Sequence, residues 1–171
     1  MNKLGIIVVY YLNDTDIDIL DLHLQSITKH TKSEYTIYGV ANRVSEVVKN
    51  HLKEYKNLEL ISVENFQGTG SEEHSFYLDK LINHAIDFDH VTHICTLDCD
   101  SFPIKEHWEQ TLYNQLSDEF PVIAISRKEN GDKFLPHPSM TFFPENSINK
   151  IISNFFHLKK KFKSQNFRNF Y

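Results

Sequence analysis

Two acidic side chains, Asp98 and Asp100, are separated by one residue directly after the apolar run 93–97. Residues at positions i and i+2 of an extended chain point to the same side, so the two carboxylates would lie together at the end of a predicted strand. A cation between them would remove their mutual repulsion. Hard divalent cations such as Mg²⁺ and Mn²⁺ bind carboxylate oxygens and keep open positions for phosphate oxygens. The pair therefore predicts a metal site for a phosphate-bearing ligand; the competing interpretation is a solvated turn, in which Asp is common.

The loop 64–70 is a second candidate, because it contains Gly68 and Gly70 just before a predicted helix. Backbone N–H groups at a helix N-terminus can bind phosphate or sugar oxygens, but the same residues could simply form the turn into the helix. Thr69 is expected to cap this helix. His74, one turn into it, is either a contact for a donor sugar or a half-buried structural histidine.

The later residues include candidates for the general base that takes a proton from an acceptor. His137 lies between two prolines, and the ordinary pKa of histidine, about 6.5, suits it to proton transfer near neutrality. The alternative is an exposed imidazole on a rigid connector. Asp132 and Glu129, in a polar loop just upstream, are the fallback candidates.

The apolar pattern alternates between strand and helix periods. Continuous apolar runs predict strands over 4–11, 35–40, 58–63, 93–97, 122–126 and 139–143. Spacings of three and four predict helices between them, over 17–27, 44–55, 74–85 and 104–116, with a last helix opening at Pro144. Such alternation predicts an α/β fold, a single three-layer Rossmann-like domain with a mostly parallel central sheet. Ligands of such sheets bind beyond the carboxyl ends of the strands, which is where Asp98 and Asp100 are expected.

Length and composition are those of one globular domain, expected over 1–157, followed by a basic aromatic tail, 158–171. The tail holds five of the 18 basic residues and none of the 23 acidic ones, so the body is strongly acidic. An acidic body argues against nucleic-acid binding, which needs basic surface to neutralise phosphates. Cys95 and Cys99 are too far apart along one strand to form a disulfide, so we expect a reduced, cytoplasmic protein without a secretory signal.

The tail 158–171 interleaves aromatic residues with its basic ones. Such a segment can lie on an anionic membrane surface, which would place the protein at the inner face of a membrane, near lipid-linked acceptors. Alternatively, it frays or packs its aromatic side chains on the domain.

From Lys3 to Phe143, the order of these elements and the Asp98-Cys99-Asp100 motif resemble family 2 and related GT-A glycosyltransferases. The resemblance implies the GT-A fold, a nucleotide-diphosphate sugar donor, and Mn²⁺ or Mg²⁺ held by Asp98 and Asp100, with Asp98 also near the donor ribose. It also implies a late histidine as third metal ligand, for which His137 is the match. Inverting chemistry follows from the resemblance alone.

The same resemblance implies which other residues contact the donor. Residues after the first strand would bind the base, here Tyr10, Tyr11 and Asn13. The glycine loop with Gly68 and Gly70 would contact the diphosphate or the sugar. After the second strand the family usually has an acidic residue that contacts the base. This chain has Asn42 there, which can hydrogen-bond a base or ribose without a charge.

The function that these residues predict is a metal-dependent glycosyltransferase, moving a sugar from a nucleotide-diphosphate donor to a hydroxyl of a glycan or lipid-linked glycan. One alternative is a non-catalytic or incomplete nucleotide-sugar-binding module. Another is a phosphatase with an Asp-x-Asp nucleophile and acid pair. That family places the pair after its first strand, whereas here it follows the fourth.

Overall fold

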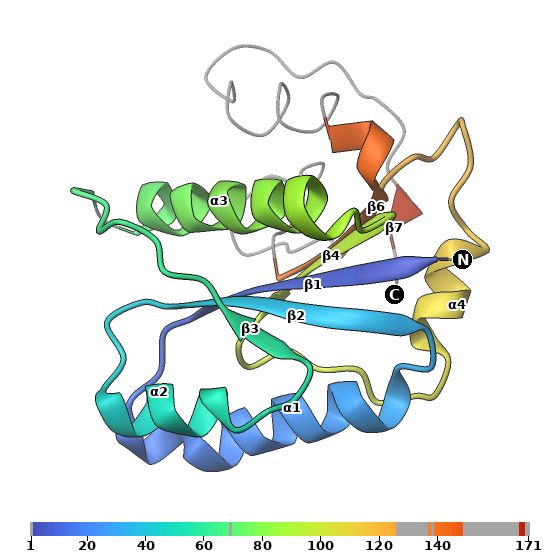
Figure 1. Ribbon diagram of the computed structural model, residues 1–171. Helices are drawn as coiled ribbons and strands as arrows, with labels where there is room; N and C mark the ends of the chain where they lie inside the picture. The colour runs from blue at the N-terminus through green and yellow to red at the C-terminus, as the bar shows by residue number, and fades with distance from the viewer. Residues whose placement is uncertain (1, 69, 126–136, 138, 149–167, 170–171) are drawn as a thin grey trace.

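The computed structural model of the chain describes residues 2–68, 70–125, 137, 139–148 and 168–169 (Figure 1). The strands of this part are β1 (Lys3–Tyr10), β2 (Glu34–Ala41), β3 (Leu58–Leu60), β4 (His93–Asp98), β5 (Ile123–Ala124), β6 (Met140–Pro144) and β7 (Arg168–Asn169). The helices are α1 (Ile17–His30), α2 (Glu46–Lys53), α3 (Ser71–Asp89) and α4 (Trp108–Tyr113), with short 3₁₀ turns η1 (Asp14–Asp16) and η2 (Glu145–Ser147).

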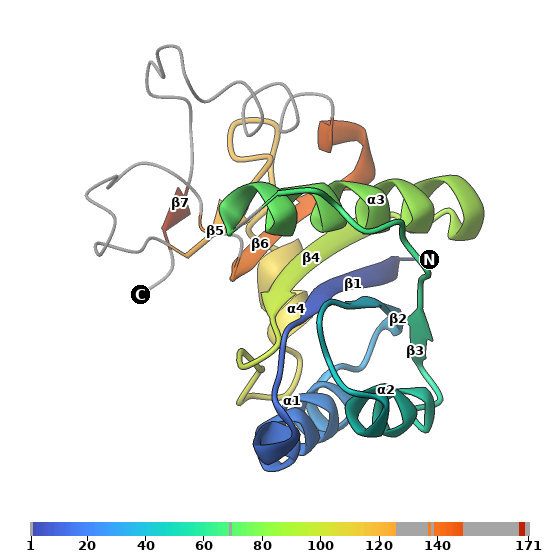
Figure 2. The same ribbon diagram turned by 90° about the vertical axis from the view of Figure 1, so that its left-hand side faces the viewer.

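All these strands join one sheet in the order β3-β2-β1-β4-β6-β5-β7. The first four of that order are mutually parallel, and β6 runs antiparallel to both β4 and β5. The parallel strands end together, since Tyr10 is paired with Ala41 and Val9 with Asp98. Figure 2 looks onto this edge of the sheet, where the chain leaves β1, β2, β3 and β4 through loops. The predicted mostly parallel central sheet is therefore confirmed.

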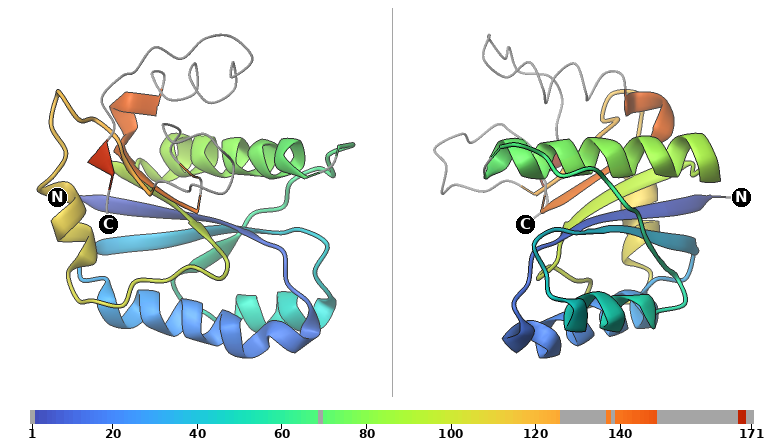
Figure 3. Two further views of the ribbon diagram at one scale, coloured as in Figure 1. Left: turned by 180° about the vertical axis from the view of Figure 1, so that it is seen from behind. Right: turned by 60° about the vertical axis from the view of Figure 1, so that its left-hand side comes forward.

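Helices cover both faces of the sheet, which gives three layers (Figures 1 and 3). Side chains of β1 alternate between the two sides: Leu4, Ile6 and Val8 pack with α1, α2 and α4, whereas Ile7 and Val9 pack with α3. Each fully buried aliphatic side chain of this kind contributes about 1.5–3 kcal/mol to the hydrophobic stabilisation. A strand that is apolar on both faces is what a central strand between two helical layers requires.

Several elements differ in extent from their predictions. The helix predicted over 104–116 is the shorter α4, which begins only at Trp108, because contacts with α1 hold the preceding residues in a loop. The Ser26 hydroxyl donates to the carbonyl of Pro103, and the backbone N–H of His107 donates to the carbonyl of His30 at 3.1 Å. Tertiary contacts thus override the helical spacing in this segment.

The C-terminal predictions are met in part by the described residues. After Pro144 the chain forms the 3₁₀ turn η2, and the rest of the predicted last helix lies outside the described residues. Arg168–Asn169 of the predicted tail pairs with β5 as a parallel edge strand. The remainder of the tail, and with it the predicted membrane contact, also lies outside. Among the residues described, no helix combines the length and apolarity needed to cross a bilayer.

Candidate functional site

Asp98 and Asp100 lie at the carboxyl edge of the parallel strands, as the sequence predicts. Asp98 is the last residue of β4 and is half-buried, whereas Asp100 is exposed in the turn that follows. The turn is closed by the backbone N–H of Ser101, which donates to the carbonyl of Asp98 at 2.9 Å. On the other side, the backbone N–H of Asp98 donates to the carbonyl of Ser139 at 3.3 Å. Asp98 is thus held between β1 and the residue before β6.

The turn 98–101 is fastened to two other elements. The Cys99 thiol donates to the carbonyl of Tyr11 at 3.9 Å, which joins the loops after β4 and β1. The Nδ1 of His23, on α1, lies 2.6 Å from the carbonyl oxygen of Ser101 and donates to it as a neutral imidazole. Burial raises the pKa of the Cys99 thiol, so it remains protonated and able to donate. These contacts fix the loop that carries Asp100.

The buried histidine makes this anchor sensitive to pH. Burial lowers the pKa of His23 to about 4, although the Ser101 carbonyl and Asp100 partly oppose that shift. The unfolded chain takes up a proton near pH 6.5, whereas the folded chain resists it until about pH 4. Stability is therefore fully present above pH 6.5 and is lost as the pH falls through this window, by roughly 2 kcal/mol between pH 7.5 and pH 5.

Urea unfolding, followed by the fluorescence of the single tryptophan, Trp108, measures this loss at the two pH values. Other titrating groups add to the pH dependence, so His23→Gln, whose amide can still donate, is the reference. The pH-dependent difference should shrink by about 2 kcal/mol in the variant. An unchanged difference would show that His23 does not resist protonation in the fold.

The residues present fit a Mn²⁺ or Mg²⁺ ion bound jointly with a diphosphate. Asp98 and Asp100 supply hard oxygen donors, and the exposure of Asp100 leaves space for phosphate oxygens and water, as these ions require. In the described parts of the chain, no three His, Cys, Asp or Glu side chains are grouped as a ready metal cage. Within these described parts, the two carboxylates therefore do not belong to a closed structural metal site.

His137 is not gathered with Asp98 and Asp100 into such a three-residue group. Its Nδ1 accepts from the backbone N–H of Ser139 at 3.2 Å and lies 2.8 Å from the Ser139 hydroxyl. Because the backbone of Ser139 also bonds to Asp98, the histidine belongs to the same edge of the sheet. Its roles as third ligand or general base stay predictions. Asp132 and Glu129, the other candidate bases, lie outside the described residues.

A cavity of about 440 Å³ opens beside this edge, at the ends of β2 and β3 and the beginning of α3. Its size is typical of small-molecule sites. Its lining comprises Val40, Ala41, Asn42, Arg43, Val44, Lys49, Val63, Asn65, Phe66, Glu73 and Tyr77. Asn42, predicted to face the donor, is among them and is nearly buried.

An ion pair crosses one side of the cavity. The guanidinium Nη2 of Arg43 lies 3.0 Å from Oε1 of Glu73, whose side chain is only 9% exposed. Arg43 also has a φ of 56°, in the left-handed region that residues other than glycine rarely adopt. Strained backbone of this kind clusters at ligand sites. Glu73 is not among the residues predicted for the site from the sequence.

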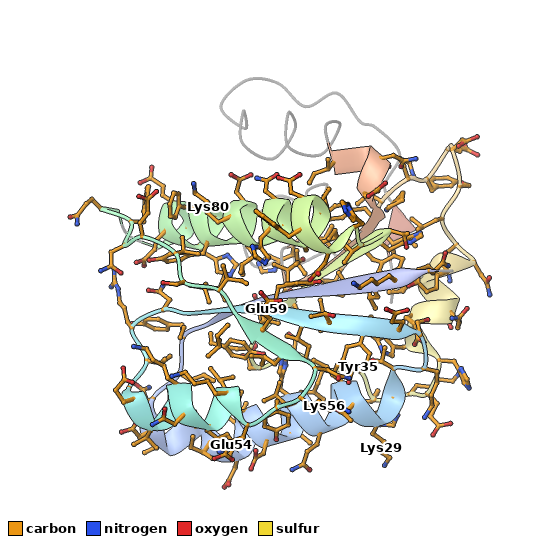
Figure 4. All side chains as sticks on the ribbon, in the orientation of Figure 1. Lys29, Tyr35, Glu54, Lys56, Glu59 and Lys80 are labelled. Carbon is orange, nitrogen blue, oxygen red and sulfur yellow. The ribbon has the colours of Figure 1, made fainter. Side chains whose placement is uncertain are left out.

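At Gly68 the glycine loop makes room for an aromatic ring. A Cβ atom there would lie 2.0 Å from the Phe66 ring, so the absence of a side chain lets this ring fold over the loop. The ring stacks on Phe76 with centroids 4.8 Å apart. Lys80, labelled on α3 in Figure 4, holds its ammonium 5.4 Å from the centroid of Phe76. Gly68 thus shapes the aromatic wall of the cavity.

Gly70 and His74 begin α3. Gly70 is the N-cap of this helix with a φ of 58°, a conformation that favours glycine. Thr69, predicted to cap the helix, lies outside the described residues. Burial lowers the pKa of His74, and the carboxylate of Asp98 partly opposes that shift. His74 therefore lies within electrostatic reach of Asp98, at the site edge.

Of the predicted donor contacts after β1, Tyr10 requires a correction. Its side chain is fully buried in the core between β1 and α1, with the ring edge-on to His23 at 5.9 Å, and cannot face a donor. Its position follows from the alternation along β1, which puts Tyr10 on the same face as Leu4, Ile6 and Val8. Tyr11 and Asn13 are exposed in the loop that follows, where a donor can reach them.

Comparisons with known proteins agree on the fold. No protein-family model matches the chain, and no curated protein matches its sequence. Solved structures do match. One is the mannosyltransferase PcManGT from Pyrobaculum calidifontis in complex with GDP-Man and Mn²⁺, with a TM-score of 0.61 and 11% identity over 86% of this chain and 46% of that one.

Two further matches come from bacteria. TarS 1–349 from S. aureus in complex with UDP has a TM-score of 0.61 and 15% identity over 87% of this chain and 48% of its own. GlyE from Streptococcus pneumoniae has a TM-score of 0.55 and 12% identity over 96% of this chain and 41% of its own. The chain thus spans less than half the length of each of these glycosyltransferases. At such identities the likeness concerns the fold, and this chain has the fold of the GT-A type glycosyltransferases.

Proposed function

We propose that the chain is the donor-binding core of a metal-dependent glycosyltransferase. Its reaction would transfer a sugar from a nucleoside-diphosphate donor to a hydroxyl group of a glycan or lipid-linked glycan, with inversion. The supporting observation is the position of Asp98 and Asp100 at the carboxyl edge of the parallel strands, the edge at which a cavity large enough for a nucleoside also opens. In sheets of this kind, that edge is where ligands bind.

Each residue at this edge would have a separate role in the reaction. Asp98 and Asp100 would hold a Mn²⁺ or Mg²⁺ ion, which neutralises the charge that develops on the leaving diphosphate. Tyr11, Asn13 and Asn42 would contact the nucleoside. His137 or Asp132 would remove the proton from the acceptor hydroxyl as it attacks the anomeric carbon. The turn 98–101 would keep the carboxylates in place through its contacts with His23 and Tyr11.

The test is a titration of the full chain with UDP-, GDP- and dTDP-sugars in the presence of Mn²⁺, followed by EDTA. A ligand that binds only the folded state raises the melting temperature, and a free concentration of 100 times the Kd stabilises the fold by about 2.7 kcal/mol. We expect at least one nucleotide sugar to raise it, and the chelator to cancel that rise. A melting temperature that no nucleotide sugar changes, with or without chelator, would contradict the proposal.

A second measurement separates transfer from binding. Release of free sugar from the bound donor, with water in place of the acceptor, reports the bond cleavage that an active site performs. Turnover that depends on Mn²⁺ supports the enzyme. Binding without turnover, even with glycan acceptors present, supports a nucleotide-sugar-binding module. Hydrolysis of a simple phosphomonoester would support the phosphatase alternative, although the acidic pair follows β4 and not the first strand.

A further inference from the structure

The cavity at the ends of β2 and β3 holds a buried carboxylate that the proposed reaction does not use. Glu73 is 7% exposed and lines the cavity from the first turn of α3. Burying a charge is costly unless it is paired, and its partner Arg43 has a side chain that is 55% exposed. Pairs of this kind are weak evidence for stability. A charged group at the wall of a cavity is better explained by a ligand that forms hydrogen bonds with it.

The polar groups on this wall form an ordered set of donors and acceptors. Arg43 presents guanidinium N–H donors, and Glu73 presents two carboxylate oxygens that only accept. Oε1 of Glu73 accepts from Arg43 at 3.0 Å, so donor and acceptors lie side by side. A carboxylate offers about four lone-pair positions, which leaves acceptor capacity on Glu73 beyond this ion pair.

Only guanine among the common bases carries the complementary edge. It presents the O6 acceptor, the N1–H donor and the 2-amino donor in one row. Uracil and thymine present acceptor, donor and acceptor, so a carbonyl oxygen would face one oxygen of Glu73. Cytosine and adenine present a ring nitrogen acceptor where guanine has N1–H. Each mismatch leaves a buried polar group unpaired or opposes two acceptors.

The rest of the cavity offers a surface on which any nucleobase can stack. Phe66 and Tyr77 contribute aromatic surface, and every nucleobase can stack on such a surface. The Phe66 ring is held by its stack on Phe76, which makes the surface a fixed wall. Discrimination therefore falls to the polar pair.

We propose that Glu73, positioned with Arg43, selects guanine, so that the donor is a guanosine-diphosphate sugar. This inference rests on the proposed function, since it takes the cavity as the nucleoside site of that reaction. Asn42 lines the same cavity without a charge, and Glu73 is the acidic residue among the described residues of that lining.

The test measures binding of GDP, IDP, UDP, dTDP and ADP to the full chain by calorimetry, with Mn²⁺ present. GDP should bind about 10- to 100-fold more tightly than UDP or dTDP, since a good bidentate contact to a base discriminates by 1–3 kcal/mol. IDP lacks the 2-amino group but keeps O6 and N1–H, so it should bind about tenfold more weakly than GDP. This comparison uses the unaltered protein and does not depend on a variant that folds.

The variant Glu73→Gln replaces one acceptor by a donor at nearly the same shape. It should bind GDP about tenfold or more weakly, leave UDP almost unchanged and lose the preference of GDP over IDP. Glu72→Gln is the matched control. Glu72 is exposed, shares the first turn of α3 and does not line the cavity, so its loss tests the helix dipole and net charge alone. It should keep the full preference for GDP.

The outcomes distinguish the two claims. Mn²⁺-dependent binding in which UDP or dTDP equals GDP would overturn guanine selection and leave the glycosyltransferase proposal standing. A GDP-over-IDP preference that survives in Glu73→Gln would equally overturn the role of Glu73. Absence of Mn²⁺-dependent binding for every nucleotide would overturn the proposed function, and the inference with it.

Discussion

Replacing Asp100 by asparagine is expected to remove Mn²⁺-dependent binding of nucleotide sugars while the fold stays intact. Asparagine has the same shape but no negative charge, and it binds hard divalent cations far less well than a carboxylate. Loss of groups that merely support a metal ligand already costs 10–100-fold in affinity, so loss of a ligand should cost more than about 100-fold. Asp98→Asn is expected to act in the same direction.

Calorimetry with a nucleotide sugar at fixed Mn²⁺ measures this effect, and the melting temperature without ligand verifies the fold. Asp118→Asn is the matched control, because Asp118 is exposed in the loop after α4, and Figure 1 shows this loop at the end of the sheet where β1 begins. It removes the same charge and should bind the donor like the unaltered chain. Unchanged Mn²⁺ dependence in Asp100→Asn would show that the metal, if bound, is held elsewhere.

The largest effect on stability is expected from Glu109→Ala. The Glu109 side chain, on α4, is fully buried, and its Oε1 accepts from the backbone N–H groups of Lys32 and Ser33, each at 2.9 Å. It also accepts from the Ser33 hydroxyl at 3.2 Å. This carboxylate therefore closes the turn from α1 into β2. Alanine would leave both N–H groups without their acceptor, at a cost of about 3 kcal/mol or more.

Urea unfolding by tryptophan fluorescence measures the loss, because Trp108 is the neighbouring residue and its indole N–H donates to Thr31 in the same turn. Glu109→Gln keeps an oxygen acceptor at nearly the same place. It should lose clearly less stability than Glu109→Ala, because the N–H groups keep a partner. Equal urea midpoints of unfolding for Glu109→Ala and the unaltered chain would refute the role of this carboxylate in closing the turn.

Most of the fold could be predicted from the spacing of apolar residues along the sequence alone. The central strands β1, β2 and β4 were predicted to within about a residue, because each is apolar on both faces and is bounded by polar residues. Edge elements were predicted less well. The edge strand β3 is only Leu58–Leu60, within the predicted 58–63, because the length of an edge strand depends on its partners, and no local pattern reveals them.

The site was predictable where chemistry is local in sequence. Asp98 and Asp100 are adjacent to one strand end, so the sequence alone predicts their position at the carboxyl edge of the sheet. The Arg43–Glu73 pair joins residues 30 positions apart, and only the packing of α3 against β2 brings them together. A signal did exist: Glu73, Tyr77 and Leu81 recur at steps of four, which puts the carboxylate on the buried stripe of α3. Likewise, alternation along β1 assigns Tyr10 to the core.

The most direct measurement is an anomalous-scattering map of a crystal grown with Mn²⁺ and a nucleoside diphosphate. Our account predicts a manganese peak coordinated by Asp100, alone or together with Asp98, and by oxygens of the diphosphate, with the nucleoside in the cavity beside Asn42. A manganese peak remote from both aspartates, or a nucleotide bound without any metal at this turn, would contradict it.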